Sequence, residues 1–409
     1  MTQSQHATPP PATATRLQAF GTTVFAEISR RALAAQAVNL GQGFPDFEGP
    51  DFVKDAAERA LRDHPNQYAP LAGLPVLTKA IADRWREDAK ATIDPANEVT
   101  VTAGCTEAIA ATILGLVNPG EKVVVFEPFY DSYVACIAMA GAEMIAVALR
   151  PDAEGRFGFD ADELARAMAT PGVRAVLVNT PHNPTGKVFS APELQSIAEL
   201  CKKHDVIAIT DEVYDRLVYR DTHNPDAKHI RMATLPDMAQ RTVTLNSLGK
   251  TFSLTGWKIG WAIAPPHLSA GVRAAHQFLT FAVATPLQRA AAAALGVDDS
   301  YYAQLAETFR AQRDLLAEAL EGLGFRFARP AGGYFILADH TQVSQRLGLA
   351  DDLAMCNHLI EKVGVATIPP SVFYVRKELG RPLLRFAFCK TEQTLRAAVE
   401  RLGGLKTGQ

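Results

Sequence analysis

The segment VIAITDEVY, residues 206–214, decides the fold of this chain. Five consecutive apolar or β-branched residues are followed at once by two carboxylates, which is typical of a strand that is buried on both faces and ends at a polar edge. Three more runs of strand length share this texture, namely EKVVVF (121–126), VRAVLV (173–178) and TVTLN (242–246). We therefore predict a mostly parallel sheet with these runs among its strands.

Helical patterns separate the strand runs. Residues 190–204, SAPELQSIAELCKKH, open with Ser190 and have Glu193 three positions later, which is a capping-box pair at a helix start. Alternation of strands and helices predicts an α/β fold, with a large domain built on a doubly wound sheet.

The pattern changes after residue 290. A helical stretch over 302–323 precedes strand candidates at 334–337, 363–368 and 383–388, and a helix over 391–402 follows. Together with a helix over 22–35, these elements predict a smaller α+β domain formed from both ends of the chain. The expected division is a disordered leader at 1–15, an N-terminal segment of the small domain at 16–50, the large domain at 51–290 and the small C-terminal domain at 291–409.

The composition favours a soluble protein with small ligands. Of 409 residues, 48% are hydrophobic and 21% are charged, and the formal net charge is −3. This balance gives no basic excess for nucleic acid and no polybasic patch for a membrane surface, and no apolar run approaches the ~20 residues of a membrane span. Five dispersed cysteines without a C-x-x-C pair favour a reducing cytoplasm and no metal site.

Polar residues follow three of the strand runs. The run at 173–178 continues into Asn183, the run at 206–210 into Asp211 and Tyr214, and the run at 242–246 into Lys250. In open α/β sheets the ligand crevice lies beyond the carboxyl ends of the strands. We therefore expect these four side chains to lie close together.

A lysine, a carboxylate, a phenol and an amide around one crevice suit a pyridoxal-phosphate site. The Lys250 amine is suited to form a Schiff base with the cofactor aldehyde and afterwards to move a proton. Asp211 is suited to hold the pyridine nitrogen protonated, which makes the ring an electron sink. Asn183 and Tyr214 are suited to bind the phenolic oxygen.

The cofactor phosphate needs backbone N–H groups and cations. A helix is expected from Glu107, and a helix N-terminus favours an anion. The residues expected to bind the phosphate are Gly104, Cys105, Thr106, Ser247 and Lys258.

A nucleotide-binding class would use the same residues differently. The segment at 206–212 resembles a Walker-B strand, and residues 249–251 (GKT) resemble the end of a phosphate-binding loop. The first glycine of such a loop falls on Thr244, inside an expected strand. No G-x-G-x-x-G follows a strand, which argues against nicotinamide binding. A P-loop NTPase stays open as a remote alternative.

The segment SLGKTFSLTGWKIG (247–260) resembles the lysine signature of fold-type I, class I pyridoxal-phosphate aminotransferases. The resemblance covers nearly the whole chain, through NLGQGFPD (39–46), NQY (66–68), NTPHNPTG (179–186), DEVY (211–214) and LRF (384–386). NLGQGFPDF (39–47) and EPFYDSY (127–133) resemble the kynurenine aminotransferase/glutamine transaminase K/methionine aminotransferase branch. TTVFAEIS (22–29) and TEAIAATILGLVNPG (106–120) also resemble actinobacterial N-succinyldiaminopimelate aminotransferases.

The resemblance implies roles for the cofactor residues. Lys250 is the implied Schiff-base lysine and general acid/base, and Asp211 pairs with the pyridine nitrogen. Asn183 and Tyr214 bind the ring oxygen, and Tyr130 takes the position of the aromatic residue that stacks on the ring.

The resemblance also implies the substrate residues. Arg385 takes the position that clamps the substrate carboxylate, and Gly43 and Asn183 line the substrate site. Tyr68 is implied to reach the phosphate, and Phe281 the pocket, of the neighbouring subunit. The resemblance therefore implies a homodimer with composite active sites.

Three positions depart from the family pattern. The class signature often has arginine where this chain has Lys258, and kynurenine-type enzymes often have tyrosine where it has Thr106. Val24 falls at the substrate-site entrance, where some of them have an aromatic residue. The lysine at 258 is expected to weaken the phosphate geometry slightly but keeps the charge, whereas Thr106 and Val24 argue against a strict aromatic or kynurenine preference.

The expected function is a ping-pong transamination that moves the α-amino group of an L-amino acid, such as methionine, glutamine or an aromatic one, to a 2-oxo acid. Two alternatives stay open beside it. One is the N-succinyl-LL-diaminopimelate aminotransferase of lysine biosynthesis, and the other is a cysteine-conjugate β-lyase side activity. The expected partners are small amino acids and 2-oxo acids, without nucleic acid or membrane.

Overall fold

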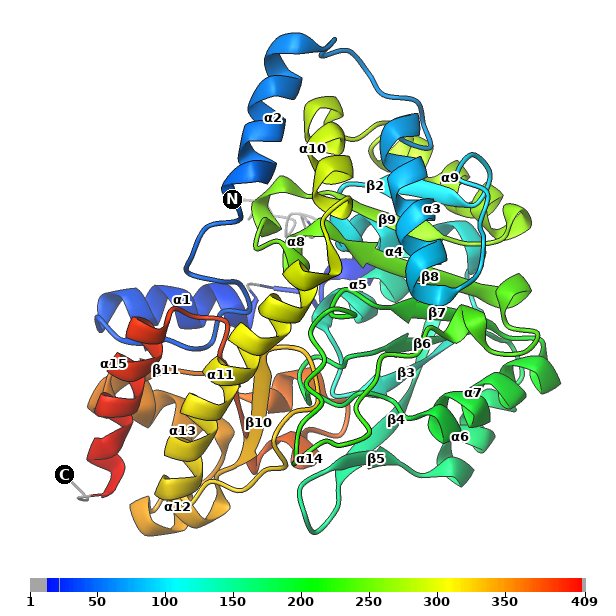
Figure 1. The fold of residues 1–409 in the computed structure, drawn as a ribbon. Coiled ribbons are helices and arrows are strands. Elements are labelled where there is room, and N and C mark those ends of the chain that lie inside the picture. Colours follow the sequence, from blue (N-terminus) through cyan, green and yellow to red (C-terminus); the bar gives the residue numbers. More distant parts are fainter. Residues whose placement is uncertain (1–12, 22, 407–409) are drawn as a thin grey trace, which may run out of the picture.

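One large sheet dominates the structure, a computed structural model that describes residues 13–21 and 23–406 (Figure 1). Its strands lie in the order β2-β9-β8-β7-β6-β3-β4-β5. Their bounds are β2 Val99–Thr102, β3 Lys122–Glu127, β4 Glu143–Pro151, β5 Phe157–Phe159, β6 Val173–Asn179, β7 Ile207–Asp211, β8 Thr242–Ser247 and β9 Gly260–Ile263. Neighbours from β8 to β4 run parallel, whereas β9 and β5 are antiparallel to their neighbours. The expected α/β fold with a mostly parallel sheet is confirmed.

Helices cover both faces of the sheet, because successive strand residues point to opposite sides. Val123 and Val125 pack with α4, α5 and α9 on one face, whereas Val124 and Phe126 pack with α6 and α7 on the other. These helices are α4 Gly104–Leu116, α5 Asp131–Met139, α6 Ala161–Met168, α7 Ala191–His204 and α9 Pro266–Leu279. Helices α2 Asp51–Asp63, α3 Pro75–Ala89 and α10 Thr285–Leu295 pack around the β2 edge. The sheet is doubly wound, as expected.

The local signals for these elements are confirmed. Each of the four expected strand runs matches a strand to within one residue at either end. Ser190 caps α7 in a capping box, in which its hydroxyl accepts the N–H of Glu193 and the Glu193 carboxylate accepts the N–H of Ser190.

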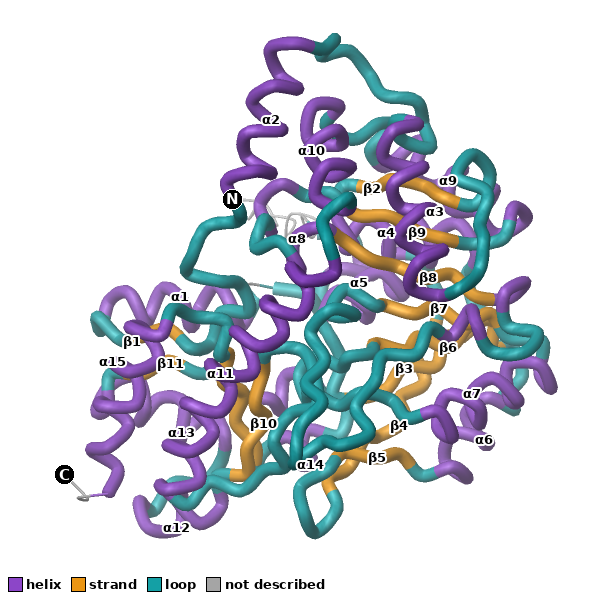
Figure 2. Tube along the Cα trace, viewed as in Figure 1, coloured by secondary structure: helices purple, strands orange, loops and turns teal. Residues whose placement is uncertain are grey.

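A segment near the N-terminus, which includes α1 and β1, and the C-terminal part of the chain together form a smaller α+β part beside the sheet (Figure 2). Strand β1 Val38–Asn39 pairs in parallel with β11 Val365–Ala366, and β10 Phe335–Asp339 pairs antiparallel with β12 Leu383–Ala387. The helices here are α1 Val24–Ala34, α11 Asp299–Leu323, α12 Thr341–Leu347, α13 Asp352–His358, α14 Lys377–Gly380 and α15 Glu392–Leu402. The predicted boundaries between the domains stay a prediction.

The strand expected over 363–368 is wrong at its start. Val363 ends a π-helix, Leu359–Val363, and Gly364 then turns the chain in a left-handed conformation with φ 77°. Only Val365–Ala366 form the strand, and Ile368 makes an isolated bridge to Arg385. One apolar run therefore spans a helix end, a turn and a strand, which its composition cannot separate.

The leader expected at 1–15 lies outside the described residues except for 13–15. Within 13–21 and 23–406, no helix has the length and apolar character needed to cross a membrane. All five cysteines are free thiols.

Candidate active site

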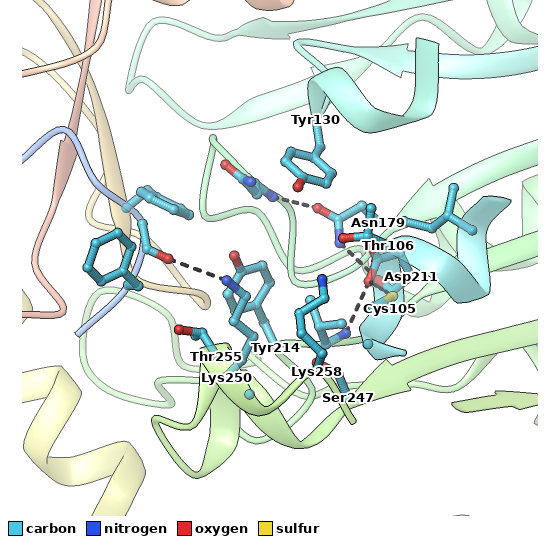
Figure 3. Close-up of a pocket in the computed structure, with 18 of the residues that line it drawn as sticks. Cys105, Thr106, Tyr130, Asn179, Asp211, Tyr214, Ser247, Lys250, Thr255 and Lys258 are labelled. Atoms are coloured by element: carbon cyan, nitrogen blue, oxygen red, sulfur yellow. Dashed lines mark hydrogen bonds between the residues drawn. The ribbon is translucent and has the colours of Figure 1, made fainter. Parts of the chain in front are cut away.

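A cavity of about 370 Å³ opens at the carboxyl ends of β6, β7 and β8, beside the smaller α+β part (Figure 3). Lys250 and Lys258 point into it from one side and Tyr130 from the opposite side. The expected site residues that line it are Gly43, Gly104, Cys105, Thr106, Tyr130, Asn183, Asp211, Tyr214, Ser247, Lys250, Lys258 and Arg385. The structure thus brings together residues that lie more than 300 positions apart in the sequence.

Asp211, at the end of β7, is the buried carboxylate of the cavity. The Tyr133 hydroxyl donates to its Oδ2 over 2.7 Å, and the N–H of Val213 donates to its Oδ1 over 3.3 Å. The Cys105 thiol also lies 3.6 Å from Oδ1. Burial raises the pKa of Asp211, and these donors act in the opposite direction because they stabilise the ionised form.

Lys250 lies in the short helix α8, Leu248–Thr251, directly after β8. Its Nζ donates to the Gly43 carbonyl oxygen over 3.3 Å and lies 5.9 Å from the centre of the Tyr214 ring. Burial lowers the pKa of the amine, and the cation of Arg385 acts in the same direction. This environment favours the neutral amine, which is the nucleophilic and proton-accepting form.

The expected anion site lies at the first turn of α4. This helix was expected from Glu107 but begins at Gly104, so Cys105 and Thr106 belong to its first turn. Glu107 accepts the N–H of Ala103 and so caps the helix three residues earlier than its pattern suggests. A Cβ on Gly104 would lie only 3.2 Å from Lys258 Nζ, which places this amine over the helix N-terminus. Backbone N–H groups and a cation therefore face the same point, as a phosphate requires.

Arg385, on β12, is a buried guanidinium without an acidic hydrogen-bond partner in the described part of the chain. It donates to the Gly41 carbonyl oxygen over 2.6 Å and to Asn183 Oδ1 over 3.3 Å, whereas its Nε has no partner. The rings of Phe25 and Phe335 lie 5.0 and 4.3 Å from the guanidinium carbon. Burial lowers the pKa of Arg385 to about 10. A substrate carboxylate would supply the negative partner for this guanidinium.

Three expected residues do not line the cavity. Tyr68 and Phe281 lie on the surface, where their rings meet edge-on at 5.3 Å, and their predicted roles in a neighbouring subunit stay a prediction. Val24 does not reach the substrate end of the cavity; the next residue, Phe25, does. The predicted role of Val24 at the entrance of the substrate site stays a prediction.

Several residues that line the cavity were not predicted from the sequence. They are Phe25, Gln42, Phe44, Tyr133 and Phe335. Tyr133 lies in EPFYDSY (127–133), three positions after Tyr130 on the first turns of α5, and this helical spacing was the available clue.

The P-loop alternative is wrong. Thr244 lies inside strand β8, and residues 249–251 lie in a four-residue helix, so no loop forms between them to hold a phosphate. Among the described residues, no cluster of His, Cys, Asp or Glu side chains is suited to a metal ion.

We expect Tyr133→Phe to make the ionised form of Asp211 less stable, because the buried carboxylate would lose the shortest hydrogen bond that it accepts. A hydrogen bond to a charged group contributes about 1.5–3 kcal/mol, which predicts a loss of roughly tenfold to hundredfold in kcat/KM at neutral pH. A pH profile of kcat/KM measures this effect. Tyr219→Phe is the matched control, since its buried hydroxyl donates to the Gly333 carbonyl oxygen away from the cavity. Equal losses in both variants would contradict the role of Tyr133.

His182, in the loop after β6, should make the protein sensitive to acid. Burial lowers its pKa to about 3 from an ordinary 6.5. Between these values the unfolded chain binds a proton that the folded chain does not, so stability falls as the pH falls from 6.5. His182→Gln should reduce this slope by one proton, about 1.4 kcal/mol per pH unit. Urea unfolding at pH 7 and pH 5 measures it, and identical slopes in both proteins would contradict the prediction.

The fold and the cavity together define an enzyme that handles amino acids: a half-buried amine and a buried guanidinium without an acidic hydrogen-bond partner among the described residues share one pocket at the carboxyl ends of a doubly wound sheet. The chain belongs to the family of class I and II aminotransferases, whose model matches residues 35–402. It is a transaminase.

Individual relatives agree with this assignment. The chain is 46% identical to a probable N-succinyldiaminopimelate aminotransferase of Mycobacterium tuberculosis, over 96% of this chain and 98% of the relative. It is 38% identical to the methionine aminotransferase of Escherichia coli, over 95% and 97% of the two chains. The solved structure of N-succinyldiaminopimelate aminotransferase from M. tuberculosis superposes with a TM-score of 0.91 at 48% identity, and covers 96% of this chain and all of that one.

Proposed function

We propose that this transaminase uses pyridoxal 5'-phosphate, held in the cavity by the residues named above. The chemistry of the donors supports this fit: a buried carboxylate at Asp211 suits a pyridinium nitrogen, and the N-terminus of α4 beside Lys258 suits a phosphate. Asn183 and Tyr214 bind the ring oxygen. When bound, this cofactor supplies an aldehyde that accepts the amino group and a ring that withdraws electrons from the substrate α-carbon.

In this proposal the proton is moved by Lys250. The side chain is half-buried and its lowered pKa favours the neutral amine, so Nζ can take the proton from the substrate α-carbon and later return one. The Gly43 carbonyl oxygen, which accepts from Nζ over 3.3 Å, holds the amine at the substrate end of the cavity. The Tyr334 hydroxyl donates to the same oxygen over 2.6 Å and thereby fixes the loop that carries it.

The observation that carries the proposal is the pairing of Lys250 with Arg385 in one cavity. Arg385 has no carboxylate partner within residues 13–21 and 23–406, and Gly41 and Asn183 orient its guanidinium. A substrate α-carboxylate bound there completes the ion pair and directs the α-carbon towards the amine. The enclosing phenylalanine rings exclude water, which strengthens this attraction.

The residues that line the cavity restrict which amino acid can act as the amino donor. Phe25, Phe44 and Phe335 surround the substrate end, and Gln42 is the polar residue among them. The cations among the described lining residues are Lys250, Lys258 and Arg385, each of which already has a role. An uncharged donor such as methionine, glutamine or an aromatic amino acid therefore suits this cavity best.

N-succinyl-LL-diaminopimelate is the second candidate donor. The similarity to the M. tuberculosis proteins favours it. Its distal carboxylates would need a cation that is not among the residues lining the cavity. In this proposal a second protomer supplies that cation. Cysteine conjugates could also be cleaved as a side activity at the same α-carbon.

One experiment separates these donors. Purified protein is loaded with pyridoxal 5'-phosphate, and the visible absorption band is followed while each amino acid is added without an acceptor. We expect a band that fades with methionine, glutamine or phenylalanine. Fading with the succinylated diamine alone would assign the second candidate. A protein that takes up no cofactor would overturn the proposal.

The enzyme is further proposed to act as a homodimer in the cytoplasm. Tyr68 and Phe281 are exposed in the single chain and lie on one apolar surface, as expected of residues that complete a partner's site. The free thiols agree with a reducing compartment. Light scattering tests the mass, and a monomer at micromolar concentration would contradict the composite site.

We expect Arg385→Lys to raise KM far more than it lowers kcat, because lysine cannot make two parallel bonds to a carboxylate. The loss of a charged hydrogen bond predicts a roughly tenfold to hundredfold decrease in kcat/KM. Initial rates with methionine measure it. The amine analogue of methionine, which lacks the carboxylate, is the control, and both proteins should use it equally poorly. A change in kcat alone would contradict the role.

A further inference from the structure

Helices α4 and α9 form a closely packed pair that connects the cavity with the surface (Figure 1). Their backbones touch at Gly115 and Gly271: a Cβ on Gly115 would lie 2.2 Å from the Gly271 carbonyl oxygen, so no larger residue fits. Helix α4 begins at the phosphate end of the cavity with Gly104, and α9 ends at Leu279 on the surface. Close-packed helices transmit displacement, so a shift of one is felt by the other.

His276 makes a second junction between these helices, and it is fully buried. Its Nδ1 lies 2.6 Å from Glu107 Oε1, and its Nε2 lies 3.1 Å from the Leu71 carbonyl oxygen. The other oxygen of Glu107 accepts the N–H of Ala103, directly before α4. His276 therefore joins the phosphate end of the cavity to the loop that carries Tyr68.

The same histidine supports the turn that carries Phe281. Its backbone carbonyl oxygen accepts the N–H groups of Thr280 and Phe281, each over 3.0 Å. Phe281 has φ 68°, a left-handed conformation that is uncommon for a bulky residue and persists where its surroundings hold it. The bonds to this turn come from the backbone of residue 276, whereas its side chain holds the loop of Tyr68 through Leu71; the edge-on contact of the Tyr68 and Phe281 rings links the two members of this exposed pair.

The exposed pair belongs to a larger apolar patch. Tyr68 is 83% and Phe281 48% exposed, and Phe278 and Leu279 at the end of α9 are 86% and 47% exposed. An apolar surface of this kind marks an interface. In the proposed homodimer its occupant is a second copy of this chain, whose cavity the Tyr68–Phe281 pair would complete because it does not line the cavity of its own protomer.

We propose that His276 couples the two active sites of the homodimer. It acts as a positioning residue. Within one protomer it connects the phosphate end of the cavity to the Tyr68–Phe281 pair, and that pair lies against the cavity of the partner protomer. This inference rests on the proposed function. Cofactor bound in one cavity orders α4, Glu107 and His276, and thereby the pair at the other cavity. Such coupling is reciprocal between the two sites.

Hybrid dimers with two different affinity tags test the coupling. One chain carries Lys250→Ala together with His276→Phe, and the other chain is unaltered. The visible band of cofactor joined to Lys250 then reports only the intact site, which receives its Tyr68–Phe281 pair from the His276→Phe chain. We expect this site to bind pyridoxal 5'-phosphate about tenfold more weakly than the intact site of a hybrid that carries Lys250→Ala alone. Equal dissociation constants would overturn the inference.

A second hybrid places His276→Phe in the chain that keeps Lys250. Coupling predicts a larger dissociation constant here too, because the junction also holds the phosphate end of its own cavity. An effect in only one of the two arrangements overturns the proposal. Ser269→Ala is the matched control: it removes a buried hydrogen bond of α9, to the Ala264 carbonyl oxygen, away from the junction, and should change neither hybrid. If His276→Phe does not fold, His276→Gln is used in the same two arrangements.

The outcomes separate this inference from the proposed function. If unaltered protein shows no visible band with pyridoxal 5'-phosphate, the proposed function fails. If the band forms and the hybrid binds the cofactor as tightly as its control, only the role of His276 fails. If the band forms but no dimer of any kind assembles, both the proposed homodimer and the role of His276 fail, whereas the use of the cofactor stands.

Discussion

Replacing Lys250 with alanine should abolish transamination, with a loss in kcat of at least roughly 10⁴-fold, the upper range for one general acid–base group. The residue has no substitute within the cavity: the other amine there, Lys258, lies beside the α4 N-terminus, at the phosphate end. The variant should keep its fold, since Lys250 makes a single hydrogen bond, to the Gly43 carbonyl oxygen. Single-turnover rates with methionine measure the loss.

Two controls make the Lys250→Ala result specific. Lys187→Ala removes a half-buried amine that pairs with Glu193 outside the cavity, and it should leave turnover unchanged. Small primary amines added to Lys250→Ala should restore part of the proton transfer, because they can enter the space that the side chain leaves. Near-normal turnover in Lys250→Ala without added amine would refute the assignment.

The large sheet could be predicted because its strands are buried on both faces, which leaves an almost continuous apolar run in the sequence. The carboxyl ends of such strands meet at one edge, so Asn183, Asp211 and Lys250 could be placed together from order alone. Short elements of the smaller part were harder to predict. Only two residues of the run at 363–368 form a strand, and the run gave no sign of the preceding π-helix.

The parts of the site that the sequence did not show depend on the direction of side chains. Tyr133 reaches Asp211 because α5 turns it inward. On α1, which begins at Val24, the second residue, Phe25, lines the cavity and Val24 does not. A shift of one residue on a helix changes which side chain points inward. Tyr68 and Phe281 can be assigned only with a second chain in place.

Replacing Asp211 with alanine should lower kcat by roughly 10²–10³-fold or more, the range for removal of one preorganised electrostatic group from a buried site. Burial raises the pKa of this carboxyl, whereas the donors Tyr133, Val213 and Cys105 and the charge of Lys250 stabilise its ionised form. A further cationic partner in the cavity would add to this stabilisation. In the proposed function that partner is the protonated ring nitrogen. Without the carboxylate, the ring loses this proton and attracts electrons from the α-carbon less strongly.

The charge of Asp211 can be separated from its shape with Asp211→Asn. Asparagine can still accept the Tyr133 hydrogen bond, so the fold should be unaffected, but it cannot hold a proton on a ring nitrogen. We therefore expect Asn and Ala variants to lose α-proton exchange in D₂O to a similar extent, and Asp211→Glu, which keeps the charge at a longer reach, to lose less. Proton NMR of methionine measures the exchange. Normal exchange in Asp211→Asn would show that the carboxylate acts by shape alone, and the proposed electronic role of Asp211 would have to be abandoned.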